Sequence, residues 1–141
     1  MKAVPNCGNY CSLACLESYL ADHGQPVDWE SLRDTFAAAG FASSEGAVWT
    51  IGAFCRGCEL AGLHAEEVPV EIPIPPKYSD GSLFIFWEKP SFHCVRFHSQ
   101  PETGKLVVMD PNVVRQGFDL RWLDKADFES ANCKFVRVAI A

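Results

Sequence analysis

The sequence is poor in basic residues and has no basic cluster, which argues against one class of partner. Its 12 Lys and Arg residues are outnumbered by 18 Asp and Glu residues, and the formal net charge is −6 at pH 7. The basic residues form nothing larger than isolated pairs around Arg115 and between Arg121 and Lys125. Because nucleic-acid-binding proteins present a strongly basic surface, we expect no nucleic-acid partner.

Long apolar runs, linkers and repeats are also missing. No stretch approaches the roughly 20 apolar residues that a membrane-spanning helix needs, and residues 1–6 lack the apolar core of a secretory signal peptide. We therefore expect no membrane partner and a protein that is cytoplasmic, or exported by a route that uses no signal peptide. With 141 residues, 48% of them hydrophobic, the chain can bury one core, which predicts a single domain over residues 1–141.

The cysteines do not form an even set. A disulfide framework would leave one thiol unpaired, and nothing else in the sequence indicates an oxidising compartment. The seven cysteines are at positions 7, 11, 15, 55, 58, 94 and 133. We expect mostly reduced thiols, so that one of them could act as a nucleophile.

The first half of the sequence has the apolar spacing of three short helices. Residues 11–23 form a helical stripe that ends before Gly24. A second helix is predicted over residues 28–40, with Asp28 as its capping residue, and a third over residues 47–60.

The second half of the sequence alternates as strands do. Prolines within residues 68–74 restrict that segment to an edge strand or an extended connector. Strands are predicted at residues 82–87, 92–98, 105–110 and 133–140, with a short helix over residues 123–128. Helices followed by an antiparallel meander are the pattern of an α+β fold.

Three residues in this arrangement have the chemistry of a cysteine nucleophile with an oriented general base. Cys11 would lie in the first turn of a helix, where free backbone N–H groups and the helix dipole favour a thiolate and could bind an oxyanion. His93 lies in a strand, and Asp110 ends the next strand. A hairpin turn near residue 101 would place His93 opposite residues near 110. We expect Asp110 to orient the imidazole.

Each of these residues also has a simpler interpretation. A cysteine on an apolar helix face is more often a small buried side chain, which is what we expect of Cys15. A single His in a strand commonly packs or faces solvent, and an Asp-Pro pair commonly marks a turn. The combination of all three residues, in this order and spacing, favours the catalytic interpretation.

The segment from Cys11 to Gly24 resembles the nucleophile helix of the C39-type, bacteriocin-processing branch of the papain-like cysteine peptidases. In that family a Cys begins a helix that ends in a Tyr-Tyr-Gly-like stop, at a separation like that between Cys11 and Gly24. Residues 93–96 and 107–111 look like the family's His-Phe-Val-Val and Asp-Pro segments. Residues 46–62 and 84–87 are similar to its following helix and to the strand before its catalytic His, so the resemblance covers nearly the whole chain.

This resemblance implies a papain-like α+β fold in which N-terminal helices pack on a C-terminal antiparallel sheet. It implies a cysteine peptidase that cleaves a peptide or protein substrate through a thioester acyl-enzyme and needs no cofactor. Cys11 maps to the nucleophile, His93 to the general base and Asp110 to its orienting partner.

The sequence departs from the family at the oxyanion hole. The family has a Gln about six residues before its nucleophile, whereas this chain has Pro5 there and no Gln before Gln25. This chain also has Ser12 after the candidate nucleophile, where the family has Gly. The side-chain amide of Asn6 or Asn9 could donate a hydrogen bond to the oxyanion instead.

Cys7 is a rival nucleophile, because Asn6-Cys7-Gly8 looks like the Asp-Cys-Gly found at the nucleophile of some family members. Choosing Cys7 would place Leu20, not a glycine, at the helix stop and would put Gly8 inside the first helical turn. We therefore favour Cys11.

Two other classes of function remain open. Cys7, Cys11, Cys55 and Cys58 could form a four-thiolate zinc site, although the last two fall within a helical pattern, and we expect no metal. Papain-like domains also serve as deamidases, acyltransferases, toxins or effectors, and catalytically silent binding domains. A cognate protein partner or inhibitor would fit an effector or a binding domain of this kind.

Overall fold

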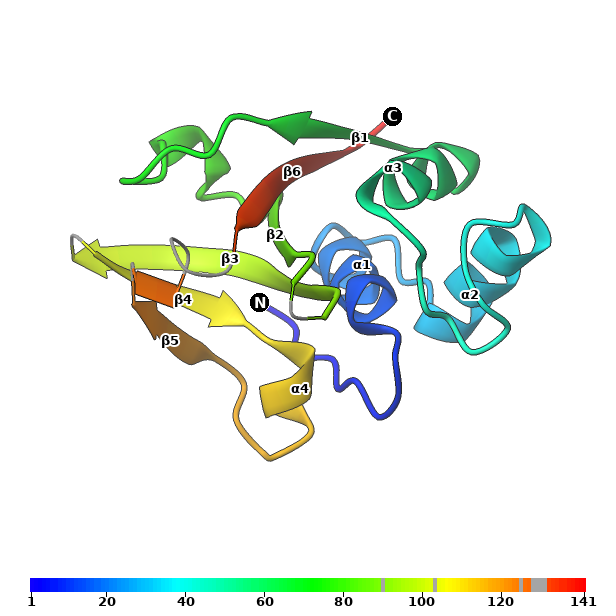
Figure 1. Ribbon diagram of the computed structural model, residues 1–141, viewed down its shortest axis with the longest axis horizontal. Helices are drawn as coiled ribbons and strands as arrows, with labels where there is room; N and C mark the ends of the chain where they lie inside the picture. The colour runs from blue at the N-terminus through cyan, green and yellow to red at the C-terminus, as the bar shows by residue number, and fades with distance from the viewer. Residues whose placement is uncertain (90, 103, 125, 128–131) are drawn as a thin grey trace.

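The computed structural model is an α+β fold with helices on one side of an antiparallel sheet, as predicted (Figure 1). It describes residues 1–89, 91–102, 104–124, 126–127 and 132–141. Three helices come first in the chain, namely α1 (Cys11–Asp22), α2 (Trp29–Ala38) and α3 (Ile51–Leu60). A short helix, α4 (Pro111–Val114), and a 3-10 turn, η1 (Pro76–Tyr78), lie within the second half. In the described residues no helix is both long and apolar enough to cross a bilayer.

The sheet has six strands across the described residues, and every pair is antiparallel. They are β1 (Leu63–Val68), β2 (Leu83–Trp87), β3 (His93–Glu102), β4 (Lys105–Met109), β5 (Arg121–Asp124) and β6 (Cys133–Ile140). Their order is β1-β6-β2-β3-β4-β5. Strands β2 to β5 form the predicted meander, but the C-terminal strand β6 returns between β1 and β2.

The sheet separates two hydrophobic clusters, and the alternation of β3 assigns its side chains to them. Cys94 belongs to the cluster on the helical side, which contains most apolar residues of α1, α2 and α3. Val95 and Phe97 belong to the other cluster, which Ile74 and Tyr78 of the β1–β2 connection cover. Because both faces are covered, all five residues of β2 are buried.

The predicted helices form with the expected termini except at the start of α3. Asp28 caps α2, because its carboxylate accepts a hydrogen bond from the Ser31 backbone N–H at 2.8 Å. Helix α3 does not begin at residue 47 as predicted. Val48 instead makes an isolated bridge with Ala42, and the Thr50 side chain caps the helix. The chain therefore stays extended until the capping residue.

Residues 69–74 form the connector that was one of the two predicted alternatives, and the edge strand is β1, at residues 63–68, which precedes it. One further prediction needs correction. A helix over residues 123–128 is wrong at its start, because Leu123 and Asp124 pair with β4 as part of β5. Residues 126 and 127 are helical, and residues 125 and 128 lie outside the described residues.

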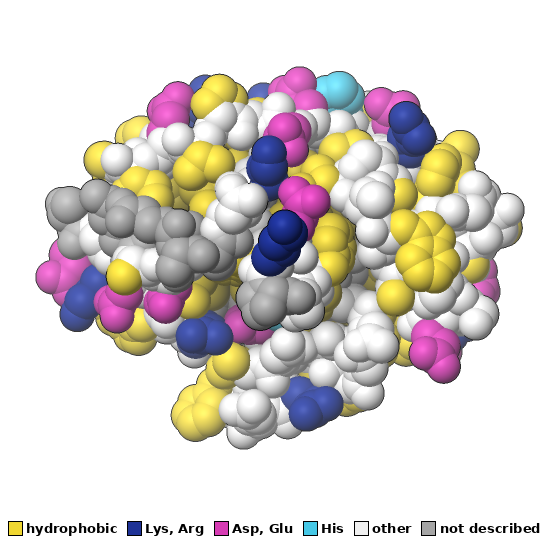
Figure 2. Space-filling view, viewed as in Figure 1, with side chains coloured by type: hydrophobic (Ala, Val, Ile, Leu, Met, Phe, Trp, Pro, Cys, Tyr) yellow, Lys and Arg dark blue, Asp and Glu magenta, His cyan; other side chains and the backbone are white. Residues whose placement is uncertain are grey.

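The surface in Figure 2 mixes side chains of all kinds. Lys and Arg side chains stand singly or in pairs among acidic and hydrophobic ones on this face, with no broad field of one charge.

Candidate active site

Cys11 is the first residue of α1, and it lines a pocket. The residue is 6% exposed. Its N-cap residue, Tyr10, contributes no side-chain hydrogen bond to the helix start, and the Tyr10 ring stacks on Trp29 with 3.6 Å between ring centroids. The first-turn N–H groups of α1 are thus not capped by the Tyr10 side chain.

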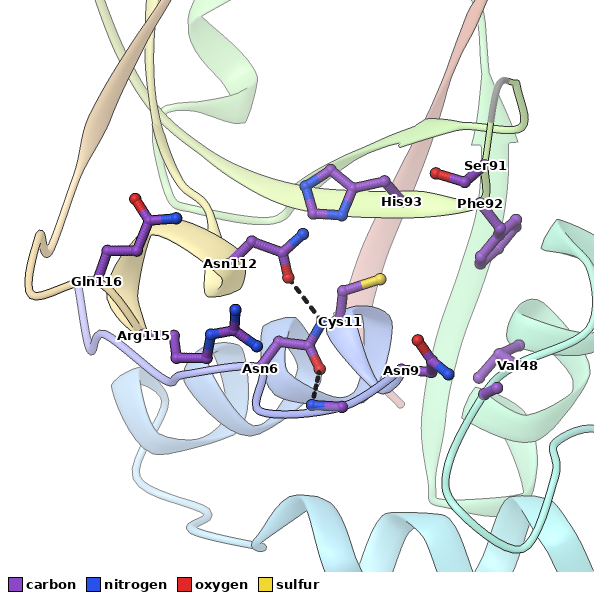
Figure 3. Close-up of a pocket in the computed structure, with 12 residues that line it drawn as sticks. Asn6, Asn9, Cys11, Val48, Ser91, Phe92, His93, Asn112, Arg115 and Gln116 are labelled. Atoms are coloured by element: carbon purple, nitrogen blue, oxygen red, sulfur yellow. Dashed lines mark hydrogen bonds between the residues drawn. The ribbon is translucent and has the colours of Figure 1, made fainter.

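His93 is the first residue of β3 and contacts both other predicted residues. Its Nε2 atom lies 3.0 Å from Oδ1 of Asp110. Cys11 also lies near the ring and is one of the causes of the raised pKa of His93. Figure 3 shows the His93 ring above the Cys11 side chain, at the edge of the same pocket. The structure thus brings Cys11, His93 and Asp110 together.

Asp110 is held at the end of β4, where it caps α4. Oδ1 accepts a hydrogen bond from the Asn112 backbone N–H at 3.0 Å as well as facing His93. Oδ2 accepts a hydrogen bond from Nη1 of Arg121 at 3.1 Å. With 3% of its side chain exposed, Asp110 is a buried carboxylate with partners on both oxygens.

The His93–Asp110 contact is diagonal across the strands. Arg96 pairs with Met109, the last residue of β4, so Asp110 lies just beyond the paired part of the strand. A register shift between Phe97 and Ser99 also separates the hairpin turn from this end of the strands. The two side chains meet because Asp110 follows the sheet face of Val108 as the chain turns at Pro111 into α4.

The environment determines the charge of both groups. Burial alone would lower the pKa of His93, but its hydrogen bonds to Asp110 and Cys11, with the charges of those groups, raise that pKa to about 9. Burial alone would raise the pKa of Asp110, but His93, the Asn112 N–H and Arg121 together lower it. Near neutral pH the site therefore holds an imidazolium beside a carboxylate.

Trp87 covers one side of this pair. Its ring stacks on the His93 imidazole with 6.0 Å between centroids and 21° between the planes. The stacking limits the orientations of the imidazole and shields its hydrogen bond from water.

Two pockets meet at His93. The larger, of about 560 Å³, contains Cys11 and is lined by Val48 and Phe92 on one side and by Asn112 and Arg115 on the other. The smaller, of about 400 Å³, lies on the Asp110 side. Both share Ser91, His93, Asn112 and Gln116. The two pockets therefore flank His93, with Cys11 bordering one and Asp110 the other.

Asn6 and Asn9, the two predicted oxyanion residues, both line the larger pocket, but only Asn6 is fixed in place. The Asn6 side chain is buried; its Oδ1 accepts hydrogen bonds from the backbone N–H groups of Gly8 and Tyr10, and its Nδ2 donates to Oδ1 of Asn112 at 2.7 Å. Asn9 is exposed. An amide nitrogen has two N–H bonds, so Asn6 keeps one for a further acceptor.

The remaining cysteines lie elsewhere. Cys7 is exposed and is not among the residues that line the larger pocket. Cys15 is buried as predicted, and its thiol donates to the Cys94 carbonyl. Cys55 and Cys58 lie on α3. All seven thiols are free, and no group of three or more His, Cys, Asp or Glu side chains in the described part of the chain is placed to hold a metal ion.

Sequence reasoning missed two neighbours of the candidate site, Arg121 and Asn112. Arg121 lies on β5, which has only four residues, two of them charged, and so gives little strand signal. Asn112 stood in the sequence as the residue after an Asp-Pro turn. Its position two residues after a capping Asp was the available signal for a backbone N–H directed at that carboxylate.

Comparison with solved structures finds close likeness over the whole chain. The peptidase domain of Streptococcus ComA, a bifunctional ABC transporter involved in quorum sensing, has a TM-score of 0.73 at 18% identity, with 99% of this chain and 98% of that chain covered. A double glycine motif protease from an AMS/PCAT transporter, in complex with the leader peptide, has a TM-score of 0.68 at 16% identity, with 99% and 91% covered. Neither protein-family models nor curated proteins match the sequence. The chain therefore has the fold of C39 peptidase domains, which agrees with the resemblance in its sequence.

Proposed function

We propose that this protein is a cysteine peptidase that cleaves a peptide bond through a thioester acyl-enzyme. The observation that carries the proposal is the position of His93, whose ring contacts Cys11 on one side and Asp110 on the other. A thiol at a helix start, an imidazole that keeps its proton and a buried carboxylate are the groups this chemistry needs. The likeness to C39 peptidase domains supports the same reaction class at the level of the fold.

The proposed reaction follows from these contacts. The Cys11 thiolate, paired with the His93 imidazolium, attacks the substrate carbonyl, and the first-turn N–H groups of α1 face the oxyanion that forms. His93 then gives its proton to the leaving amine, which leaves a thioester on Cys11. A water molecule, deprotonated by His93, hydrolyses the thioester and restores the free thiol. Asp110 holds the imidazole with Nε2–H directed away from the sulfur throughout.

The substitution that tests this proposal is Cys11→Ala, with Cys7→Ala as the matched control. We expect Cys11→Ala to abolish peptide cleavage while its melting temperature stays close to that of the wild type. Cys7 is exposed and should leave cleavage largely intact when replaced. Equal loss in both variants, or loss only in Cys7→Ala, would refute the assignment of the nucleophile.

The first peptide to test is one with a double-glycine motif, because the second similar structure holds a leader peptide on a double glycine motif protease. Cleavage is best followed by mass spectrometry, which also detects a mass change of one unit from deamidation and transfer of an acyl group to an added amine. These readouts separate the peptidase from a deamidase or an acyltransferase with the same groups.

Labelling with a thiol-reactive electrophile at mildly acidic pH tests activation without a substrate. A thiolate held by an imidazolium reacts there, whereas ordinary thiols are protonated and react slowly. We expect modification at Cys11 alone. Slow, uniform modification of the exposed thiols, with none at Cys11, would favour a catalytically silent binding domain.

A further inference from the structure

Arg121 completes the hydrogen bonding of Asp110, although β5 contributes no other residue to the site. The backbone register explains how it reaches the carboxylate. Arg121 pairs with Val108 across β4 and β5, so both side chains lie on the same face of the sheet. Asp110 follows Val108 by two residues and returns to that face. A long side chain can span this diagonal, and Nη1 of Arg121 lies 3.1 Å from Oδ2 of Asp110.

The two oxygens of Asp110 have different partners. Oδ1 faces the His93 ring and accepts from the Asn112 N–H, whereas Oδ2 accepts from Arg121. A carboxylate held through one oxygen can turn about its terminal bond, but one held through both has a fixed plane. The ion pair is buried at the carboxylate and open to solvent at the guanidinium, because the Asp110 side chain is 3% exposed and the Arg121 side chain 40%.

The Arg121 side chain also contacts its neighbouring residue and one of the two pockets. Nε of Arg121 donates to the Trp122 carbonyl at 3.4 Å, and the residue lines the smaller pocket beside His93. We infer that Arg121 is a positioning residue of this site, which fixes the plane of the Asp110 carboxylate so that Oδ1 accepts the imidazole N–H. The effect of Arg121 on kcat rests on the proposed function, whereas its effect on the orientation of Asp110 does not.

The charges around His93 define the competing explanations. Cys11 faces it from α1, Asp110 from the end of β4 and Arg121 from β5, and the two pockets add the cationic side chains of Lys89 and Arg115. If Arg121 acted only as a nearby positive charge, its removal would make His93 easier to protonate. If Arg121 instead orients Asp110, its removal weakens the Asp110–His93 hydrogen bond, which favours protonated His93. The pKa of His93 would then fall. The direction of the change therefore separates the two roles.

The experiment is an NMR titration of the His93 ring in Cys11→Ala protein, which needs no turnover. Arg121→Met and Arg121→Lys are added to this background, and Arg56→Met, an exposed residue of α3 outside both pockets, is the control. We expect the His93 pKa to fall in Arg121→Met, to fall less in Arg121→Lys and to stay unchanged in Arg56→Met. An unchanged or raised pKa in Arg121→Met would overturn the inference. If Arg121→Met does not fold, an unchanged value in Arg121→Lys overturns it equally, because lysine keeps the charge and loses the planar fork.

Kinetics of the same Arg121 variants with Cys11 restored give the second readout. We expect kcat to fall about tenfold to a hundredfold in Arg121→Met, because the general base is misplaced, with KM changed less than about twofold. Arg121→Lys should recover part of kcat. A rise in KM at constant kcat would assign Arg121 to substrate binding and overturn its positioning role. Absence of cleavage in the wild type would contradict the proposed function alone, because the titration stands without it.

Discussion

At the scale of single residues, we propose that Asn6 takes the oxyanion-hole role of the missing glutamine in addition to a structural role. Asn6 Oδ1 holds the backbone N–H groups of Gly8 and Tyr10 and so shapes the loop that leads into α1. Its Nδ2 faces the pocket side and donates to Asn112. The exposed Asn9 has no comparable restraint. We therefore assign the proposed oxyanion donor to Asn6.

Replacing Asn6 with Asp separates these tasks. The carboxylate keeps an acceptor for the Gly8 and Tyr10 N–H groups but has no N–H to donate. We expect kcat to fall by about 10² to 10³, the usual effect of losing one oxyanion donor, with little change in KM. Steady-state kinetics check this, and Asn9→Asp is the control. A larger effect at Asn9 than at Asn6 would reverse the assignment.

That Cys11, His93 and Asp110 lie together could be predicted from the sequence, because each of these candidate catalytic residues belongs to a recognisable local pattern. Cys11 starts an apolar helical stripe, His93 starts an alternating strand, and Asp110 precedes a proline. Arg121 could not be predicted, because its contact depends on the pairing of β5 with β4, which the four residues of β5 do not reveal. Contacts that depend on register are determined by the whole sheet rather than by local propensity.

At the scale of elements, periodicity located the first three helices and most strands, but it misplaced the start of α3 and missed strands β1 and β5. Residues 47–50 have helical apolar spacing, yet Val48 pairs with Ala42, and α3 begins only after its capping residue Thr50. Residues 63–68 were not recognised as a strand, because three of them, His64, Glu66 and Glu67, are polar. In both segments a tertiary contact outweighed the local signal.

Helix α3 also shows how one glycine can be essential to packing while another is not. A Cβ atom at Gly57 would lie 2.3 Å from the ring of Phe36, which is fully buried on α2. A Cβ at Gly52 would meet only the Thr50 side chain, at 3.8 Å. The close approach of α2 and α3 therefore depends on the missing side chain of Gly57.

We expect Gly57→Ala to lower the free energy of unfolding by about 1–3 kcal/mol, the usual cost of overpacking a core. Gly52→Ala should instead be neutral or stabilising, by up to about 1 kcal/mol, because alanine loses less backbone entropy in a helix. Urea denaturation of both variants measures the difference. Equal stability of the two would mean that α2 and α3 are not packed as closely as Gly57 indicates.

At the scale of the whole molecule, the site joins the two halves of the fold. Cys11 comes from the helical half, whereas His93 and Asp110 come from the sheet, so the three side chains meet only when the helices are packed on the strands. The interactions that prepare the chemistry therefore also contribute to the stability of the fold, and this contribution depends on pH.

The sign of that dependence follows from the two pKa changes. The pKa of His93 rises from an ordinary value of 6.5 to about 9 in the folded protein, so its contribution is complete below pH 6.5 and is lost as the pH rises towards 9. The pKa of Asp110 is lowered, so its contribution is present at neutral pH and is lost in acid. Buried thiols such as Cys58 and Cys94, whose pKa values burial raises, begin to weaken the fold as the pH enters the range in which an unfolded thiol ionises.

Between pH 6.5 and 8.5 the wild-type protein should therefore lose stability through His93, on the order of 2 kcal/mol. Urea denaturation at intervals across this range measures the loss. In His93→Gln the glutamine does not titrate, so its free energy of unfolding should change little over the same interval. Asp110→Asn should show a reduced slope, because the neutral amide no longer holds the imidazolium. Parallel curves for the wild type and His93→Gln would mean that protonation of His93 adds nothing to the stability of the folded state.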